Sequence, residues 1–367
     1  MVDPMGKLAL LLGIIEGKRA YTGPSYVMLD VVRRCNIRCI GCFFHCPQGR
    51  RPMPGDPQVN EISWPLVDKI CEELPKLGTK EIILVGEGEP FLHPELIDFI
   101  RSFKRAGFKV QLFTNGTLFT EELSRGLAKS GLDVLNVTFW AVNEREHEVC
   151  HPQTSLKLLP KRREGLALYL KHRQEDGRAP SLNLVFPINR HNWRNLQGRI
   201  ALVESVRPDS VSFNLFRDFG GKHQPLMLTT VEVNSLSHDL RAMGKRLQDL
   251  GVAVNPEEYL SQARLGPRVW QTIPCYAGWF ETYIKVDGTI LPCGHCYHDV
   301  GNMLEEPFAA IWNGSKMRDF RRQGVRLKGA GPLPSSCDCA NCCQIKDNLR
   351  VQRILQWLAP SRSGIHR

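Results

Sequence analysis

The chain has 367 residues, 42% of them hydrophobic and 23% charged, which predicts a soluble globular protein with one large domain and a smaller one. Its formal net charge of +10 is spread without interleaved aromatic residues, so nucleic acid is not an expected partner. Solvated helix faces explain the dense basic segments at 161–163 and 318–328, and an anionic substrate or acidic partner is the alternative.

The longest apolar run extends from Leu8 to Ile15. It is too short to span a bilayer and lacks a signal-peptide cleavage site. We therefore expect a short packing helix, with a membrane-touching helix as the alternative. A cytoplasmic protein without stable membrane insertion is predicted.

Strands and helices are expected to alternate through the first two thirds of the sequence. Apolar and β-branched runs predict six strands, at residues 26–32, 81–85, 109–114, 134–139, 182–186 and 210–216. Amphipathic segments predict the helices between and after them, at residues 63–78, 94–107, 120–130, about 157–173, from 193, and about 230–250. Because strands that alternate with helices form parallel βα units, the expected fold is an α/β barrel or an open doubly wound sheet.

The residues that follow three of these strands favour the barrel. "RRCNIRC" (33–39) follows the first strand, "GEGEP" (86–90) the second and "TNG" (114–116) the third. In barrels the carboxyl ends of the strands carry the active site. A dinucleotide-binding doubly wound fold would need a glycine-rich turn after its first strand, and this sequence has none there.

Three cysteines lie close together after the first predicted strand, as Cys35-x3-Cys39-x2-Cys42. Without an export signal, the thirteen cysteines are expected to be reduced, so metal or catalytic thiols are favoured over a disulfide scaffold. A zinc site usually has paired C-x2-C units and four ligands. Three close cysteines suit three corners of a [4Fe–4S] cluster and leave one iron open to a non-protein ligand, with zinc as the alternative.

Taken in order, the three motifs resemble those of the radical S-adenosylmethionine (SAM) enzymes. The resemblance implies a partial (β/α)6 TIM-like barrel in which the open iron of the cluster binds SAM. It implies that Cys35, Cys39 and Cys42 are the catalytic cluster ligands. The other residues that it implicates in SAM binding are Gly88, Glu89 and Pro90, which would receive the SAM amino group, Thr114 and Asn115, near the ribose and methionine, and Phe43, near the adenine.

Beyond residue 260 the alternation ends and the sequence becomes rich in Cys, Gly and Pro. Cys275 and Cys293 flank a predicted β-hairpin with an Asp-Gly turn, and Cys339 and Cys342 follow later. The two pairs and the segment between them resemble the SPASM and twitch domains of radical SAM enzymes. The spacing resembles the twitch version, which implies one auxiliary [4Fe–4S] cluster bound by these four cysteines, with structural zinc as the alternative.

Four further cysteines lie close to the implied ligands and remain alternatives to them, or ligands of a second auxiliary cluster: Cys46, Cys296, Cys337 and Cys343. Cys71 and Cys150 are expected to be inert. The predicted division of the chain is an N-terminal extension (1–25), the radical SAM barrel (26–260), the twitch or SPASM-like domain (261–350) and a C-terminal tail (351–367).

The resemblance implies an enzyme that uses an electron from a flavodoxin- or ferredoxin-type reductant to cleave SAM. The resulting 5′-deoxyadenosyl radical would abstract hydrogen from a small-molecule substrate in a biosynthetic pathway. Transfer of a second electron to the auxiliary cluster would make the reaction an oxidation, of the dehydrogenation, decarboxylation or epimerisation type.

Three alternatives to this function remain. Peptide maturation is less favoured, because only about 25 residues precede the first predicted strand and leave no room for a leader-binding domain. The second is radical addition or rearrangement on a lipid or other anionic substrate. A non-enzymatic electron carrier is disfavoured, because it would not need "GEGEP" and "TNG" at neighbouring strand ends.

Overall fold

The structure is a computed structural model that describes residues 4–46, 59–175, 180–216, 218, 224–254, 273–330, 337 and 345–358. In these ranges a single sheet of ten strands has the order β10-β9-β8-β1-β2-β3-β4-β5-β6-β7. Seven of its strands pair in parallel and in chain order. They are β1 (Tyr26–Asp30), β2 (Glu81–Val85), β3 (Lys109–Thr114), β4 (Val134–Thr138), β5 (Ser181–Ile188), β6 (Ser210–Leu215) and β7 (Ala253–Val254).

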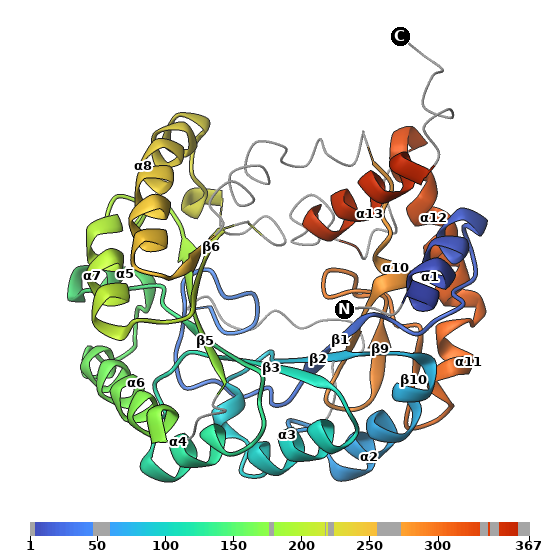
Figure 1. The fold of residues 1–367 in the computed structure, drawn as a ribbon, viewed down its shortest axis with the longest axis horizontal. Helices are drawn as coiled ribbons and strands as arrows, with labels where there is room; N and C mark the ends of the chain where they lie inside the picture. The colour runs from blue at the N-terminus through green and yellow to red at the C-terminus, as the bar shows by residue number, and fades with distance from the viewer. Residues whose placement is uncertain are drawn as a thin grey trace.

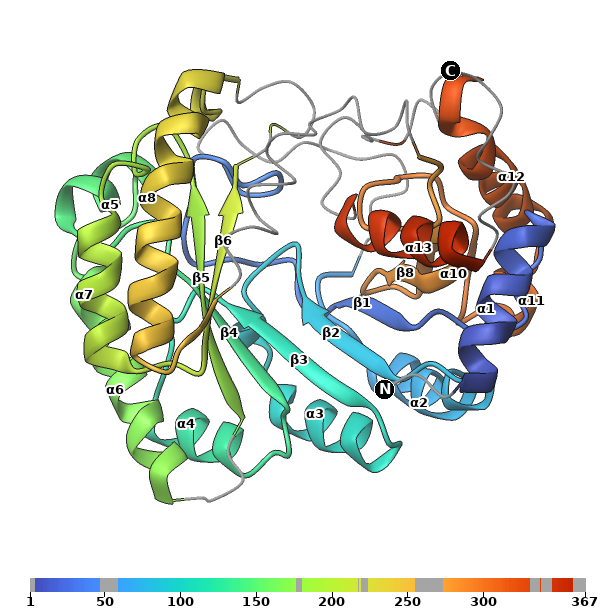
Figure 2. The same ribbon diagram turned by 45° about the horizontal axis from the view of Figure 1, so that its top comes forward.

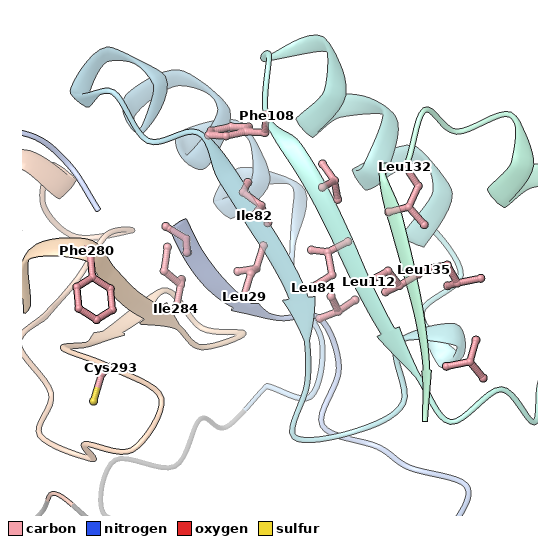
Figure 3. Packing of buried hydrophobic residues seen from close by; sticks show 14 of the residues in the cluster. Leu29, Ile82, Leu84, Phe108, Leu112, Leu132, Leu135, Phe280, Ile284 and Cys293 are labelled. Carbon is pink, nitrogen blue, oxygen red and sulfur yellow. The ribbon is translucent and has the colours of Figure 1, made fainter. Parts of the chain in front are cut away.

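Helices cover the outer, convex face of this curved sheet (Figure 1). They are α2 (Trp64–Glu73), α3 (Leu96–Arg105), α4 (Glu121–Ala128), α5 (Glu144–Cys150), α6 (Leu158–Glu175), α7 (Leu196–Val206) and α8 (Thr230–Asp249). The core lies between the helices and the outward side chains of the strands, among them Leu29, Leu84 and Leu112 (Figure 3). Since side chains alternate along a strand, Met28 and Asp30 face the inside of the partial barrel.

The predicted elements of this part of the chain are confirmed, with ends shifted by a few residues. The helix after the first strand, for example, begins at Trp64 and is followed by a short 3-10 turn that ends at Gly78 in the left-handed conformation. Sequence analysis missed α5, a helix of seven residues that is capped by the Asn143 side chain. It also missed the two-residue strand β7. Both are too short to carry a periodic pattern.

The C-terminal region continues the same sheet. Its elements are α10 (Ala277–Phe280), β8 (Glu281–Ile284), β9 (Thr289–Leu291), β10 (Gly301–Asn302), α11 (Phe308–Trp312), α12 (Ser315–Ala330) and α13 (Ile345–Leu358). The predicted hairpin is confirmed, because β8 and β9 are antiparallel and Gly288 adopts a positive φ of 85° in the turn. The sequence did not predict that β8 pairs in parallel with β1, next to the barrel strands (Figure 2).

The apolar run near the N-terminus forms helix α1 (Pro4–Glu16), which packs on the C-terminal region as a short helix. Gly13 allows close contact, because a Cβ at this position would lie 3.2 Å from the Trp279 ring. The Trp279 indole nitrogen donates a 3.0 Å hydrogen bond to the carbonyl of Arg19. None of the helices described here is long and apolar enough to cross a membrane.

Candidate active site

The loop that follows β1 carries the three predicted cluster ligands and is called the cluster loop (residues 31–46). Loss of solvent around the sulfur raises the pKa of the Cys35 thiol to about 12 and raises the pKa values of Cys39 and Cys42. The neighbouring thiols add to the shifts of Cys35 and Cys39. The loop rests on α5, since the Ile40 amide donates a 2.9 Å hydrogen bond to the Cys150 carbonyl.

The donor set of this loop fits an iron–sulfur cluster better than a zinc ion. Three desolvated thiols that oppose one another's ionisation need a cationic group to become thiolates. In the part of the chain that the structure describes, no three His, Cys, Asp or Glu side chains are arranged to hold a metal ion. Three cysteines on one short loop match the donor set of a [4Fe–4S] cluster with one open iron, whereas a structural zinc site has four protein ligands.

Residues 86–90, called the SAM loop, lie directly against the cluster loop. The Glu89 amide donates a 2.8 Å hydrogen bond to the Arg34 carbonyl. Only glycine fits at position 88, because a Cβ there would lie 2.0 Å from the Arg34 carbonyl oxygen. The strand ends therefore bring the second predicted motif into backbone contact with the first.

Glu89 joins the SAM loop to the end of β3. Its carboxylate accepts hydrogen bonds from the Thr114 hydroxyl (2.6 Å), the Asn115 amide (2.7 Å) and the Phe91 amide (3.1 Å). Burial raises the pKa of Glu89, while these hydrogen bonds act in the opposite direction. Pro90 begins the 3-10 turn Pro90–Leu92, which directs the chain away from the strand end. The structure thus brings together the predicted residues of all three motifs.

Arg162, on α6, is a candidate functional residue that sequence analysis missed. The sequence interpretation was a solvated helix face, and the structure corrects it: the side chain is fully buried, and none of its guanidinium nitrogens has a hydrogen-bond partner within the described residues. Burial lowers the pKa of Arg162 to about 10, while Cys39 and Glu89 favour its charged form. The helical spacing of the buried residues Leu159, Arg162 and Leu166 was the available signal.

The Arg162 guanidinium lies over the Phe139 ring, 5.1 Å from its centroid, and this cation–π contact leaves its N–H groups without acceptors among the described residues. Buried N–H donors of a charged group favour an anion as their partner. The neighbouring His151 cannot supply one, because an imidazole side chain is either neutral or cationic. Burial and the nearby positive charge of Arg162 lower the pKa of His151 to about 2, so the ring is neutral and adds no second positive charge. Glu89 and Arg162 influence each other electrostatically, but within the described residues no hydrogen bond joins them. The site therefore presents one negative and one positive group, which suits a zwitterionic amino acid moiety.

Phe43, the predicted adenine contact, lies at the end of the cluster loop. Its ring stacks on Tyr297, with 5.5 Å between the ring centroids, and meets Phe44 edge-on at 5.1 Å. Gly41, which directly precedes Cys42, is crowded: a Cβ there would lie 2.3 Å from the Phe216 ring and 2.8 Å from Trp140. Aromatic side chains from other segments thus fill the space that a larger residue at position 41 would need.

Two of the four predicted auxiliary ligands lie in the described part of the C-terminal region. Cys275 and Cys293 are both buried, and the Cys275 amide donates a 2.9 Å hydrogen bond to the Gly324 carbonyl. Cys339 and Cys342 lie outside the described residues, as does the alternative ligand Cys343.

Cys296 and Cys337, predicted to be reduced and open as alternative ligands, form a disulfide in this structure. This corrects the expectation of unpaired thiols at these two positions. A β-bridge brings the two residues together across 41 positions of sequence, with their Cα atoms 4.0 Å apart. Sequence spacing alone does not indicate such a contact.

Comparison with known proteins assigns this fold and site to a class. The model of the Radical SAM superfamily matches residues 29–173, and the model of SPASM, an iron–sulfur cluster-binding domain, matches residues 275–343. Together the matches cover more than half of the chain and define a SAM-dependent iron–sulfur enzyme. The chain belongs to the radical SAM superfamily and carries a C-terminal SPASM domain, and its cofactors are SAM and [4Fe–4S] clusters.

Curated relatives align with most of the chain. A tungsten-containing aldehyde ferredoxin oxidoreductase cofactor-modifying protein from Pyrococcus furiosus is 27% identical over 81% of this chain and 83% of its own length. An AdoMet-dependent heme synthase from Nitratidesulfovibrio vulgaris is 22% identical, covering 85% of each chain. A PqqA peptide cyclase from Gluconobacter oxydans is also 22% identical, over 86% of this chain and 82% of its own length.

Solved structures support the fold assignment. anSMEcpe with bound AdoMet superimposes with a TM-score of 0.62 at 15% identity, over 93% of this chain and 96% of that one. Streptococcus suis SuiB bound to S-adenosylmethionine gives 0.59 at 14% identity, over 91% and 75% of the two chains. At these identities the likeness establishes the shared architecture of barrel and C-terminal domain.

Proposed function

We propose that the protein reductively cleaves SAM and abstracts a hydrogen atom from a small-molecule substrate, in a two-electron oxidation such as dehydrogenation or oxidative decarboxylation, with redox-neutral epimerisation as the variant in which the substrate radical regains a hydrogen atom. The observation that carries the proposal is the junction at Glu89, where the cluster loop, the SAM loop and the end of β3 meet. When bound, the reduced cluster and SAM supply the 5′-deoxyadenosyl radical that takes the hydrogen atom. A flavodoxin- or ferredoxin-type protein is the proposed electron donor.

The proposed roles of the site residues follow from their placement. Cys35, Cys39 and Cys42 hold the first cluster. Glu89 receives the SAM ammonium, while Arg162 receives the SAM carboxylate and balances the charge of the nearby thiolates. Their opposite charges and burial support this assignment, because desolvated ion pairs orient a ligand strongly.

The proposed division of labour assigns residues 26–260 to SAM cleavage and residues 261–350 to one auxiliary cluster. Its ligands are Cys275, Cys293, Cys339 and Cys342. The burial of Cys275 and Cys293 supports a thiolate site closed to solvent. The disulfide between Cys296 and Cys337 leaves those two cysteines out of the ligand set in this structure.

The names of the relatives support a small-molecule substrate, with a peptide substrate as the second candidate. The heme synthase and the cofactor-modifying protein favour the first, together with the net charge of +10, which suits an anionic compound. The PqqA peptide cyclase and SuiB bound to its precursor peptide favour the second.

The basic test is SAM cleavage. Anaerobically purified protein reduced with dithionite should convert SAM to 5′-deoxyadenosine and methionine, measured by liquid chromatography and mass spectrometry. A protein that binds its clusters but forms no 5′-deoxyadenosine would contradict the proposed function. Deuterium transfer from a labelled candidate compound into 5′-deoxyadenosine then separates small molecules from peptides as substrates.

Glu89→Gln is expected to weaken SAM binding by roughly 1–3 kcal/mol, which corresponds to about 5- to 150-fold, because a charge-assisted bond in a desolvated site is lost. Iron content should stay at the wild-type value, since Glu89 is not a cluster ligand. Equilibrium SAM binding to the reconstituted protein measures the effect. Glu95→Gln is the matched control, because this nearby carboxylate contacts Trp64 outside the site. Unchanged SAM affinity in Glu89→Gln would show that residues 86–90 form a turn without a role in SAM binding.

Arg162→Gln is expected to weaken SAM binding by about 10- to 150-fold, the equivalent of losing one or two charge-assisted hydrogen bonds. Circular dichroism should show that the variant is folded, because Arg162 also packs over the Phe139 ring. Arg163→Gln, next to it on α6, loses only a hydrogen bond to the Val142 carbonyl and serves as the control. If Arg162→Gln and Arg163→Gln both bind SAM with wild-type affinity, Arg162 has no role in SAM binding.

A further inference from the structure

Tyr283, in the C-terminal region, contacts the end of β1, the strand that precedes the cluster loop. It lies on β8 beside Met28 of β1 in the parallel register. Its hydroxyl donates a 2.5 Å hydrogen bond to Oδ1 of Asp30, the last residue of β1. Both side chains are buried, and the two residues are 253 positions apart in sequence. A polar contact of this kind couples the C-terminal region to the strand that leads into the cluster loop.

Asp30 carries the contact onward to the SAM loop. The same Oδ1 atom accepts a 2.9 Å hydrogen bond from the Glu87 amide. The Glu87 carboxylate in turn forms a buried ion pair with Arg33 of the cluster loop, at 2.9 Å. Two residues further along, the Glu89 amide is bonded to the cluster loop. The path from Tyr283 to the SAM loop is therefore two hydrogen bonds that meet on one oxygen atom.

The Asp30 carboxylate depends on two hydrogen-bond donors, the Tyr283 hydroxyl and the Glu87 amide. Burial and the neighbouring charge of Glu87 raise the pKa of Asp30 to about 7, whereas the hydrogen bonds from Tyr283 and from the Glu87 amide lower it. The second oxygen, Oδ2, has no hydrogen-bond partner within the described ranges. Without the Tyr283 hydroxyl, the buried carboxyl group of Asp30 would accept a hydrogen bond only from the Glu87 amide. The Asp30 side chain would then be held less firmly, and so would the Glu87 amide that is bonded to it.

We infer that Tyr283 is a positioning residue for SAM, which acts through Asp30 on the loop that carries Glu89. The C-terminal region would then contribute to SAM affinity although every proposed SAM contact belongs to the barrel. The inference rests on the proposed role of Glu89. It concerns binding of SAM, separately from any role of the auxiliary cluster.

The test is Tyr283→Phe, which removes one hydroxyl and keeps the ring. We expect SAM binding to weaken by about 3- to 10-fold, as loss of one hydrogen bond to a buried acceptor predicts. The rate of 5′-deoxyadenosine formation at saturating SAM and the iron content should stay within about 2-fold of wild type. Tyr276→Phe is the matched control, because this hydroxyl of the same region bonds to Gln352 and does not reach β1.

A double-mutant cycle shows whether Tyr283 acts through Asp30. Asp30→Ala should weaken SAM binding more than Tyr283→Phe does, and the double variant should bind SAM as Asp30→Ala does. Asp30→Asn keeps an oxygen acceptor and should bind within about 3-fold of wild type, so it remains informative if Asp30→Ala does not fold. Unchanged affinity in Tyr283→Phe, or additive effects in the cycle, would overturn the inference. If Glu89→Gln also leaves the affinity unchanged, the proposed SAM site itself is wrong.

Discussion

Replacing Cys35, Cys39 and Cys42 together with alanine is expected to abolish SAM cleavage and to lower the iron content from about eight to about four irons per chain. The three thiols are the whole protein donor set of the first cluster in the proposed site. Without them, no iron remains next to Glu89 and Arg162 to deliver an electron to SAM. Iron and acid-labile sulfide analysis of anaerobically purified protein, together with a 5′-deoxyadenosine assay, measures both effects.

Cys71→Ala is the control for this experiment. Its thiol lies on α2, half-buried beside Ser102, and should change neither iron content nor SAM cleavage. Retained SAM cleavage in the triple variant would contradict the assignment of the active site. A wild-type content near twelve irons would instead show a second auxiliary cluster and require further ligands among the remaining cysteines.

Replacing Cys339 and Cys342 together with alanine is expected to preserve SAM cleavage but to eliminate the oxidised product. The residues proposed to bind SAM all lie in the barrel, so formation of 5′-deoxyadenosine should continue, and deuterated substrate should still label it. A two-electron oxidation also needs an acceptor for the second electron, and these cysteines are proposed to help hold it. Product analysis by mass spectrometry should therefore show labelled 5′-deoxyadenosine without oxidised product.

Folding must be controlled in this double variant, because a cluster that joins loop segments also stabilises the fold. Circular dichroism and SAM affinity should match the wild type before turnover is compared. Cys339 and Cys342 are preferred over Cys275 and Cys293 for this test, because the latter two belong to the buried core and their loss would also disturb packing. Near wild-type product yield from the folded variant would make the auxiliary cluster structural and favour radical addition or rearrangement.

The central part of the site could be predicted from the sequence because it is local or follows from the order of the strands. Cys35, Cys39 and Cys42 lie within eight residues, so their spacing is visible without a fold. Glu89 and Thr114 are far apart in sequence, but Glu89 follows one predicted parallel strand and Thr114 is the last residue of the next. Since the carboxyl ends of neighbouring parallel strands meet at one edge, their 2.6 Å contact could be anticipated in outline.

Other features of the site could not be predicted from the sequence, because they depend on which face of a helix packs against the rest of the protein. Arg162 lies in a basic run that is typical of a solvated helix, yet the face that it shares with Leu159 and Leu166 is buried, and its guanidinium lies over the ring of Phe139, the residue after β4. Its guanidinium therefore lies beside Cys39 and Glu89 instead of in water. A composition-based interpretation counts its charge but does not show its burial.

By itself, the sequence determined the alternation of strands and helices, the hairpin after Cys275 and the three motifs at the strand ends, because these depend on side-chain periodicity and turn residues over a few positions. Only the tertiary structure decided that β8 joins β1, that Tyr283 reaches Asp30 and that Cys296 meets Cys337. These contacts join residues 41 to 255 positions apart. They form only when the whole sheet is assembled, because no local pattern offsets the entropy of closing such long loops before the core packs.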